Sequence, residues 1–170
     1  MKKYLYLIIP LLFIVIVFSF KYFDIIFNNT PSTPIGFYKK TEGNISTDDY
    51  IAFCLDEKLT AFGLSRGYLE KCSPCQGSKP LIKKVIAIPR DTITVTKNFI
   101  LTKTQLYNLT TLNIDSSGRY LYSIKNGNYK ENCYWVIGDH DSLSSWDSRY
   151  WGCISKAQIL YKVTPLLIWN

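Results

Sequence analysis

An uncharged apolar run near the start of the chain constrains the fold more than any other feature of the sequence. The run extends from Tyr4 to Phe20 and directly follows Lys2 and Lys3. A helix that spans a bilayer needs roughly 17–25 such residues, so the run is just long enough to cross a membrane. It lacks the polar face of a helix packed on a soluble core, and no Ala-x-Ala pattern marks a signal-peptide cleavage site after it. We therefore expect a retained single-span anchor.

The two lysines before the run predict which side of the membrane holds the rest of the chain. Basic residues that flank a spanning helix favour the cytoplasm, so residues 1–24 are expected to hold a cytoplasmic tip and the transmembrane helix. Residues 25–170 would then form one exported domain, because 170 residues are about one domain's worth. The net charge of +7 is spread along the chain, which argues against a nucleic-acid partner.

Five cysteines fit an oxidising compartment, in which structural disulfides form. They are Cys54, Cys72, Cys75, Cys133 and Cys153, so at least one stays unpaired. Zinc at Cys72-Ser-Pro-Cys75 would need a second ligand pair, but His140 is the only histidine. A thioredoxin-like motif would need a βαβ context that is missing here. We expect structural disulfides and no metal or cofactor. Cys133 and Cys153 could pair across a hairpin, but the spacing leaves the connectivity open.

Short runs of β-branched and aromatic residues between turn signals predict a mainly β domain. The predicted strands are residues 50–55, 81–88, 92–95, 99–102, 120–124, 133–137 and 159–163. Turns are expected at residues 42–44, 116–118 and 126–128, where glycine lies beside Asn or Ser. Residues 56–69 predict one short helix.

A serine is the first candidate for catalysis, because a single histidine leaves no Ser-His-Asp set to choose from. Ser32 follows the anchor closely and lies between Pro31 and Pro34, which hold the local backbone in an extended path. From composition alone, residues 28–36 are more typical of an ordinary linker between the anchor and the domain.

Two lysines in an apolar run supply a candidate base. Lys83 and Lys84 lie within residues 81–88, and strand alternation directs their amines to opposite faces. Burial lowers the pKa of a lysine, and a neutral amine can take a proton from a serine hydroxyl. Alternation leaves open which lysine faces inward, and an edge strand with both amines in solvent is the alternative.

A polar loop completes the set of unusual segments. Residues 138–152 hold three aspartates, four serines and an arginine between aromatic residues. Asp147 and Arg149 are close enough in sequence to form an ion pair that would stiffen the loop.

Together the three segments resemble the bacterial signal peptidase family of Ser-Lys serine proteases, and most of all its conjugative-transfer TraF-type branch. Residues 30–38 are similar to the family's Asn-x-Thr-x-Ser-x-Pro-x-Gly-like stretch, and residues 83–91 to its Lys-Arg strand that ends in Pro-Gly-Asp. Residues 138–152 are similar to its Gly-Asp-Asn…Ser-x-Asp-Ser-Arg-Tyr-Trp-Gly loop. The resemblance implies a signal-peptidase-like antiparallel β-sheet catalytic domain, held by one N-terminal transmembrane helix on the periplasmic side of the bacterial inner membrane.

The resemblance also implies a role for each motif residue. Ser32 would be the nucleophile and Lys83 the general base, which decides between the two lysines. The backbone N–H of Ser32 and the hydroxyl of Thr30 would form the oxyanion hole. Substrate would bind as an added strand, with shallow pockets for small residues before the cut.

Further roles fall on the polar loop. The resemblance implies that Ser145 orients the Lys83 amine and that Asp147 and Arg149 brace the loop. Four positions depart from the family pattern, namely Thr33 for Met, Lys84 for Arg, Arg90 for Gly and His140 for Asn.

The implied function is a serine endopeptidase that removes leader peptides from exported proteins, with a conjugative pilin precursor as the expected substrate. Joining the ends of the processed pilin is a reaction associated with the TraF-type branch. A general signal peptidase I is the alternative within the class. A catalytically silent assembly module of a pilus or secretion machine is the alternative outside it, although the intact Ser32 and Lys83 argue against that reading. A disulfide oxidoreductase using Cys72 and Cys75 is a further alternative, and the oligomeric state stays open.

Overall fold

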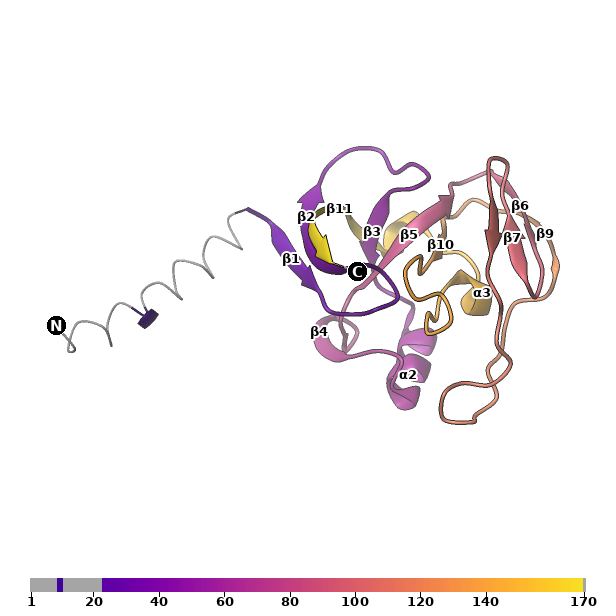
Figure 1. The fold of residues 1–170 in the computed structure, drawn as a ribbon, viewed down its shortest axis with the longest axis horizontal. Coiled ribbons are helices and arrows are strands. Elements are labelled where there is room, and N and C mark those ends of the chain that lie inside the picture. Colours follow the sequence, from indigo (N-terminus) through magenta and orange to yellow (C-terminus); the bar gives the residue numbers. More distant parts are fainter. Residues whose placement is uncertain (1–8, 11–22, 170) are drawn as a thin grey trace.

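Two antiparallel sheets form the framework of the described chain, which comprises residues 9–10 and 23–169 of a computed structural model (Figure 1). The strands of the larger sheet, in spatial order, are β1 (Ile25–Asn28), β2 (Ile35–Thr41), β11 (Ile159–Trp169), β3 (Tyr50–Phe53), β5 (Leu81–Ala87) and β10 (Trp135–Ile137). Those of the smaller sheet are β8 (Leu106–Asn108), β7 (Phe99–Leu101), β6 (Thr92–Val95) and β9 (Gly127–Lys130). The prediction of a mainly β domain is confirmed.

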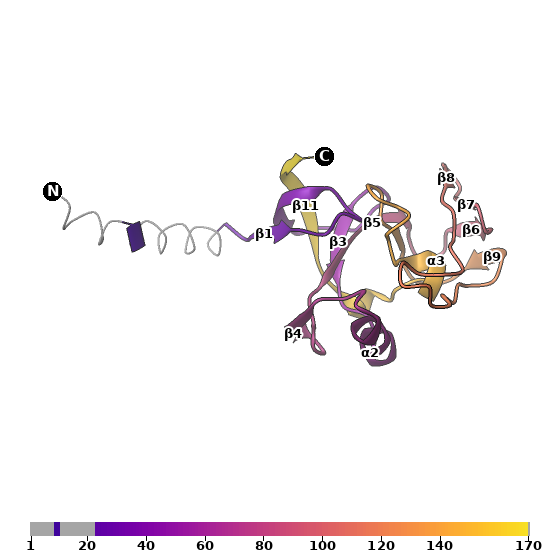
Figure 2. The ribbon, with the colours of Figure 1, turned by 60° about the horizontal axis from the view of Figure 1, so that its bottom comes forward.

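The remaining elements are short. They are the strand β4 (Lys71–Cys75), the helices α2 (Glu57–Arg66) and α3 (Ser148–Trp151), and the 3₁₀ turn η1 (Lys156–Gln158). In two views turned by 60°, α3 lies between the two sheets, and α2 lies with β4 at one end of the larger sheet (Figures 1 and 2).

The predicted membrane anchor lies mostly outside the described residues. Within residues 9–10 and 23–169, no helix is long and apolar enough to cross a bilayer. Only residues 9, 10, 23 and 24 of the predicted anchor segment are described. The anchor and the domain boundary after residue 24 therefore stay predictions.

Strand β5 is paired along both edges, by β3 and by β10, and core residues pack on both of its faces. Val85 packs with Ile51 and Val136 in one core. Ile86 and Ile137 belong to a second core, which residues of β6 and β7 cover from the smaller sheet. Both faces of this strand are therefore screened from water, and a polar side chain on either face needs a partner.

Helix α2 forms where the sequence predicts a helix, and its ends have clear causes. The side chain of Asp56 caps the first turn by accepting a hydrogen bond from the Leu59 N–H at 2.9 Å. Gly67 ends the helix in the left-handed region, at φ 75°, and its N–H reaches carbonyl groups of the last turn.

Two sequence predictions of local structure are wrong. Residues 120–124 form no strand, and only Tyr120 pairs, in an isolated bridge with Ile114. The carboxylate of Asp115 accepts the N–H groups of Ser117 and Arg119 at 2.9 Å each, and so holds a closed turn in place of a sheet edge. The turn predicted at residues 126–128 is instead the start of β9, which pairs with β6 from Gly127 onward.

The turn after β5 contains Arg90, one of the four departures from the pattern noted in the sequence. Arg90 has φ 76°, in the left-handed region that costs a residue with a side chain roughly 1–2 kcal/mol. Its N–H donates to the Glu131 carbonyl at 2.9 Å. Asp91 closes the same turn by accepting the Ile88 N–H at 3.0 Å. Hydrogen bonds on both sides thus hold the arginine in this conformation.

Two disulfides are present, as the cysteine count predicts. One joins Cys54 to Cys75 and the other joins Cys133 to Cys153, while Cys72 is free and exposed. The alternative of a Cys72–Cys75 redox pair is wrong for this structure, because Cys75 is already bonded to Cys54.

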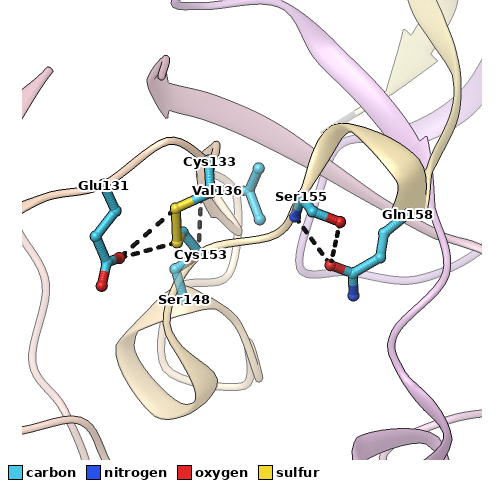
Figure 3. Close-up of a disulfide and its surroundings, with 7 residues drawn as sticks. All are labelled: Glu131, Cys133, Val136, Ser148, Cys153, Ser155 and Gln158. Atoms are coloured by element: carbon cyan, nitrogen blue, oxygen red, sulfur yellow. Dashed lines mark hydrogen bonds between the residues drawn. A yellow bond between two sulfur atoms is a disulfide. The ribbon is translucent and has the colours of Figure 1, made fainter. Parts of the chain in front are cut away.

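An acidic side chain lies against the second disulfide. The carboxylate of Glu131 has its Oε2 atom 2.9 Å from Sγ of Cys153 (Figure 3). Glu131, Cys133 and Cys153 are close enough together to hold a metal ion. The two sulfur atoms are bonded to each other, however, and so are not available as thiolate ligands.

Candidate active site

The loop between β1 and β2 carries Ser32 to strand β5 of the larger sheet. Ser32 is 7% exposed and Lys83 of β5 is 2% exposed. A hydrogen bond joins Lys83 Nζ to Ser32 Oγ, and within residues 23–169 it is the only one that this amine makes. A buried lysine therefore directly contacts the hydroxyl that the sequence nominates as a nucleophile.

The register of β5 answers the question that strand alternation leaves open. Lys83 lies opposite Ile51 of β3, on the face that packs into the first core. Lys84 lies opposite Tyr50, and its ammonium forms an ion pair with Asp48 at 3.1 Å. Of the two lysines, Lys83 alone faces the serine.

Burial changes the proton affinity of Lys83. Loss of water around the amine lowers the pKa of Lys83 to about 8, with a further lowering by Arg149. The carboxylates of Asp147 and Asp139 oppose this effect. A lysine of ordinary pKa has fewer than about one amine in a thousand neutral at pH 7, whereas a pKa near 8 leaves about one in ten neutral. The site therefore holds a usable population of neutral amine.

The two hydrogen-bond donors expected in the oxyanion hole differ in whether they already have an acceptor. The Ser32 N–H has no hydrogen-bond acceptor within residues 23–169 and is free to bind one. The Thr30 hydroxyl instead donates to Asn28 Oδ1 at 2.7 Å. A substrate oxyanion would thus meet one free donor, and the Thr30 proton would have to turn away from Asn28.

The polar loop docks directly on the serine loop. The N–H of Asp141 donates to the Pro31 carbonyl at 3.1 Å, and that of His140 to the Ser32 carbonyl at 3.4 Å. These two backbone bonds fix the distance between the loop and the segment that carries Ser32.

Ser145 lies near the site but does not contact the lysine. Its hydroxyl donates to Asp147 Oδ2 at 2.8 Å, and the Gly138 N–H donates to the same oxygen at 3.0 Å. Within the described residues, no hydrogen bond joins Ser145 to Lys83. The role of orienting the lysine amine stays a prediction that this contact pattern does not support.

Asp147 and Arg149 form a fully buried, two-point ion pair. The guanidinium Nε lies 2.8 Å from Asp147 Oδ1 and Nη2 lies 2.9 Å from Oδ2. The remaining donors reach the carbonyl groups of Thr110, Ser142 and Ser145. One arginine thus ties both ends of the polar loop to a neighbouring segment.

Comparison with known proteins adds to this geometry. Residues 1–168 match the family described as signal peptidase, peptidase S26. The chain belongs to this peptidase S26 family. The resemblance noted in the sequence is therefore confirmed.

Relatives of known name include plasmid transfer proteins. Two proteins named plasmid transfer protein TraF, both from Escherichia coli, are 28% identical to the chain over 147 and 146 residues. Each alignment covers 84% of this chain and 82% of the relative. A signal peptidase I from Enterococcus faecalis V583 matches 73% of this chain and 100% of its own, with 18% identity and a TM-score of 0.40.

The pH dependence of this peptidase S26 member should report the titration of Lys83. Because the base must be neutral, we expect kcat/KM for precursor cleavage to rise with pH through about 8 and then level off. His140→Ala should leave this profile unchanged, because the histidine side chain is exposed and only its backbone N–H contacts Ser32. A rate that instead rises near pH 6.5, and disappears in His140→Ala, would make histidine the base.

A glycine keeps the polar loop close to the nucleophile in this family member. A Cβ atom at Gly138 would lie 2.6 Å from the Ser32 carbonyl oxygen and 2.6 Å from Ser145 Cβ. Sequence reasoning singles out neither Gly138 nor Asn28. Gly138 begins the polar loop and Asn28 begins the stretch of residues 28–36 around Ser32, but the sequence of these segments does not say which contact a residue makes.

We expect Gly138→Ala to lower kcat/KM by about 100-fold, because the methyl group forces the polar loop away from Ser32. The measurement is cleavage of a precursor by purified protein, with circular dichroism as the check on folding. Gly127→Ala is the matched control, since the nearest atom to its added Cβ is 3.8 Å away. Equal rates for both variants would show that the close approach at Gly138 has no role.

Proposed function

We propose that this chain is a membrane-anchored serine endopeptidase that cleaves leader peptides from exported proteins, with Ser32 and Lys83 as its dyad. The observation that carries the proposal is the buried hydrogen bond between Lys83 Nζ and Ser32 Oγ. Nothing else in the described site pairs a nucleophile with a neutral base.

The chemistry follows from these two groups. The neutral Lys83 amine takes the hydroxyl proton of Ser32 as Oγ attacks the scissile carbonyl carbon. The Ser32 N–H stabilises the negative charge that develops on the carbonyl oxygen. The protonated amine then returns its proton to the leaving amino group, and an acyl-enzyme ester remains. Water resolves the ester in hydrolysis. Ring closure would instead need a cut at the carboxyl side of the pilin, which leaves the pilin's own carbonyl on Ser32 Oγ; the amino terminus of the same pilin then attacks this ester and releases the serine.

A hollow beside the serine loop supports binding of an extended peptide. A cavity of about 170 Å³ lies between the end of β1 and the start of β5, with Thr30 and Ile82 among its walls. Two strand ends thus flank a gap that a substrate segment can enter as an added strand.

Exposed apolar side chains support a membrane location. Phe27, Leu167 and Trp169 are 46%, 61% and 45% exposed. The rings of Phe27 and Trp169 lie 6.0 Å apart, and both pack on Phe37. These residues belong to the neighbouring strands β1, β2 and β11, where the chain leaves the predicted anchor segment (Figure 2). A patch of this kind favours contact with lipid.

The relatives support a conjugative pilin precursor as the substrate, because two of them are plasmid transfer proteins. The test is co-expression with candidate pilin precursors, followed by the mass of the product. Loss of the leader mass alone means hydrolysis, and a product one water lighter than the linear peptide of the same residues means a ring. Processing of unrelated leaders at the same rate would indicate a general signal peptidase. An unprocessed pilin precursor with every candidate leader would contradict the proposal.

A further inference from the structure

The carboxamide of Asn28 lies inside the loop that carries Ser32. Its Nδ2 is 3.1 Å from each of three carbonyl oxygens, those of Thr30, Thr33 and Pro34. Its Oδ1 accepts the Thr30 N–H at 3.2 Å and the Thr30 hydroxyl at 2.7 Å. The side chain is 4% exposed, so these partners replace water completely. One buried amide therefore holds the loop on both sides of Ser32.

The loop needs such a partner because its own backbone is short of donors. Pro31 and Pro34 have no N–H, and the loop spans the six residues between β1 and β2. Asn28 is the last residue of β1 and pairs with Gly36 of β2, so its backbone is fixed by the sheet. Its side chain thus connects a rigid strand to a loop whose own backbone has too few N–H donors to fix its conformation.

We propose that Asn28 is a positioning residue, which sets the place of Ser32 against Lys83 by holding the loop from within. The inference rests on the proposed function, since it assigns Asn28 a part in the same reaction. The amide fixes Thr30 before the serine and Thr33 after it, so Ser32 Oγ stays against the amine while its N–H stays free.

The loop has a second effect, because it covers the Lys83 amine. The charged groups that face Lys83 are Asp139, Asp147 and Arg149, and none of them contacts Asn28 within the described residues. Disordering of the loop would leave these charges in place and admit water to the amine. The pKa of Lys83 would then rise toward that of an ordinary lysine.

The test compares three variants of the full-length protein in detergent. Asn28→Ala should lower kcat by about 100-fold with KM within about threefold, since a misplaced nucleophile loses rate and not binding. Titration of the Lys83 side chain by NMR, with ¹³C-labelled lysine, should show a higher pKa than in the wild type. Asn29→Ala is the matched control, because Asn29 is exposed and, within residues 23–169, its side chain hydrogen-bonds only to Lys79 and Glu70 on the surface.

Asn28→Asp keeps the size of the side chain and guards against loss of folding in the alanine variant. The introduced carboxylate would face three carbonyl oxygens, so burial and repulsion favour its protonated form, which regains one donor. The ratio of variant to wild-type kcat should therefore rise as the pH falls, a trend that simple destabilisation does not produce.

The inference on Asn28 and the proposed function can fail separately. Wild-type kcat and an unchanged Lys83 pKa in Asn28→Ala would overturn the inference and leave the peptidase intact. A raised KM with unchanged kcat would also overturn it, because Asn28 would then serve only binding. A higher Lys83 pKa in Asn28→Ala, together with a wild-type protein that cleaves no precursor, would support the positioning of the loop and overturn the proposed function.

Discussion

Ser32→Ala should abolish precursor cleavage while the protein keeps its fold. The change removes one oxygen whose only hydrogen-bond partner within the described residues is the Lys83 amine. Lys83→Ala should be equally inactive, because Ser32 then has no base. Loss of either member of such a unit costs at least about 10³-fold in rate, and the double variant should be no worse than either single one. The measurement is the initial rate of leader removal by purified protein.

Lys84→Ala provides the matched control for the dyad. Its ammonium lies on the opposite face of β5 and pairs with Asp48, so most of the activity should remain. An inactive Lys84→Ala beside an active Lys83→Ala would reverse the assignment. Losses that multiply in the Ser32→Ala, Lys83→Ala double variant would show that the two residues act independently.

Asp147→Ala should lower both the activity and the stability by a large amount. It leaves Arg149 buried without its counter-charge, and breaking such a pair costs about 3–5 kcal/mol. For a chain of this size that corresponds to a fall in Tm of about 6–20 °C. Gly138 and Ser145 lose their acceptor in the same step, so the loop that docks on Ser32 should loosen. Thermal melts and cleavage rates measure the two effects.

The exposed ion pair between Glu70 and Lys79 provides a control for the loss of stability expected in Asp147→Ala. Glu70→Ala removes the ion pair with Lys79, whose side chains are 35% and 54% exposed for Lys79 and Glu70, and such pairs contribute at most about 1 kcal/mol. Loss of activity in Asp147→Ala without a change in Tm would show that Asp147 takes a direct part in the reaction.

The residues of the candidate site could be predicted from the sequence, because they lie in three continuous motifs. Ser32 and Lys83 follow from the resemblance, and the structure brings the two together, although their catalytic role stays a prediction. Composition alone could not choose Lys83 over Lys84, because the choice depends on which face of β5 meets the core. The contacts of Asn28 could not be predicted either, since they arise only when the loop closes around its side chain.

The fold was predicted less completely, because whether a segment becomes a strand depends on pairing with segments far away in the sequence. Strands with continuous apolar runs, such as β3 and β5, appear in the sequence almost at their true bounds. Strand β9 escapes prediction because its residues, Gly-Asn-Tyr-Lys, have the composition of a turn, and pairing with β6 makes them a strand. Residues 120–124 show the converse, since aromatic residues with no neighbouring strand form none.

The position of β11 has a consequence for how the protein is made. In the larger sheet this strand lies between two strand pairs. One is the β1–β2 hairpin, whose loop contains Ser32, and the other is the β3–β5 pair, which carries Lys83. Its residues follow those of all the other described strands in the sequence. The two halves of the larger sheet therefore cannot join until β11 has been synthesised, which delays assembly of the site. A nascent chain without β11 carries the serine and the lysine on separate halves of the sheet, and so its site is incomplete.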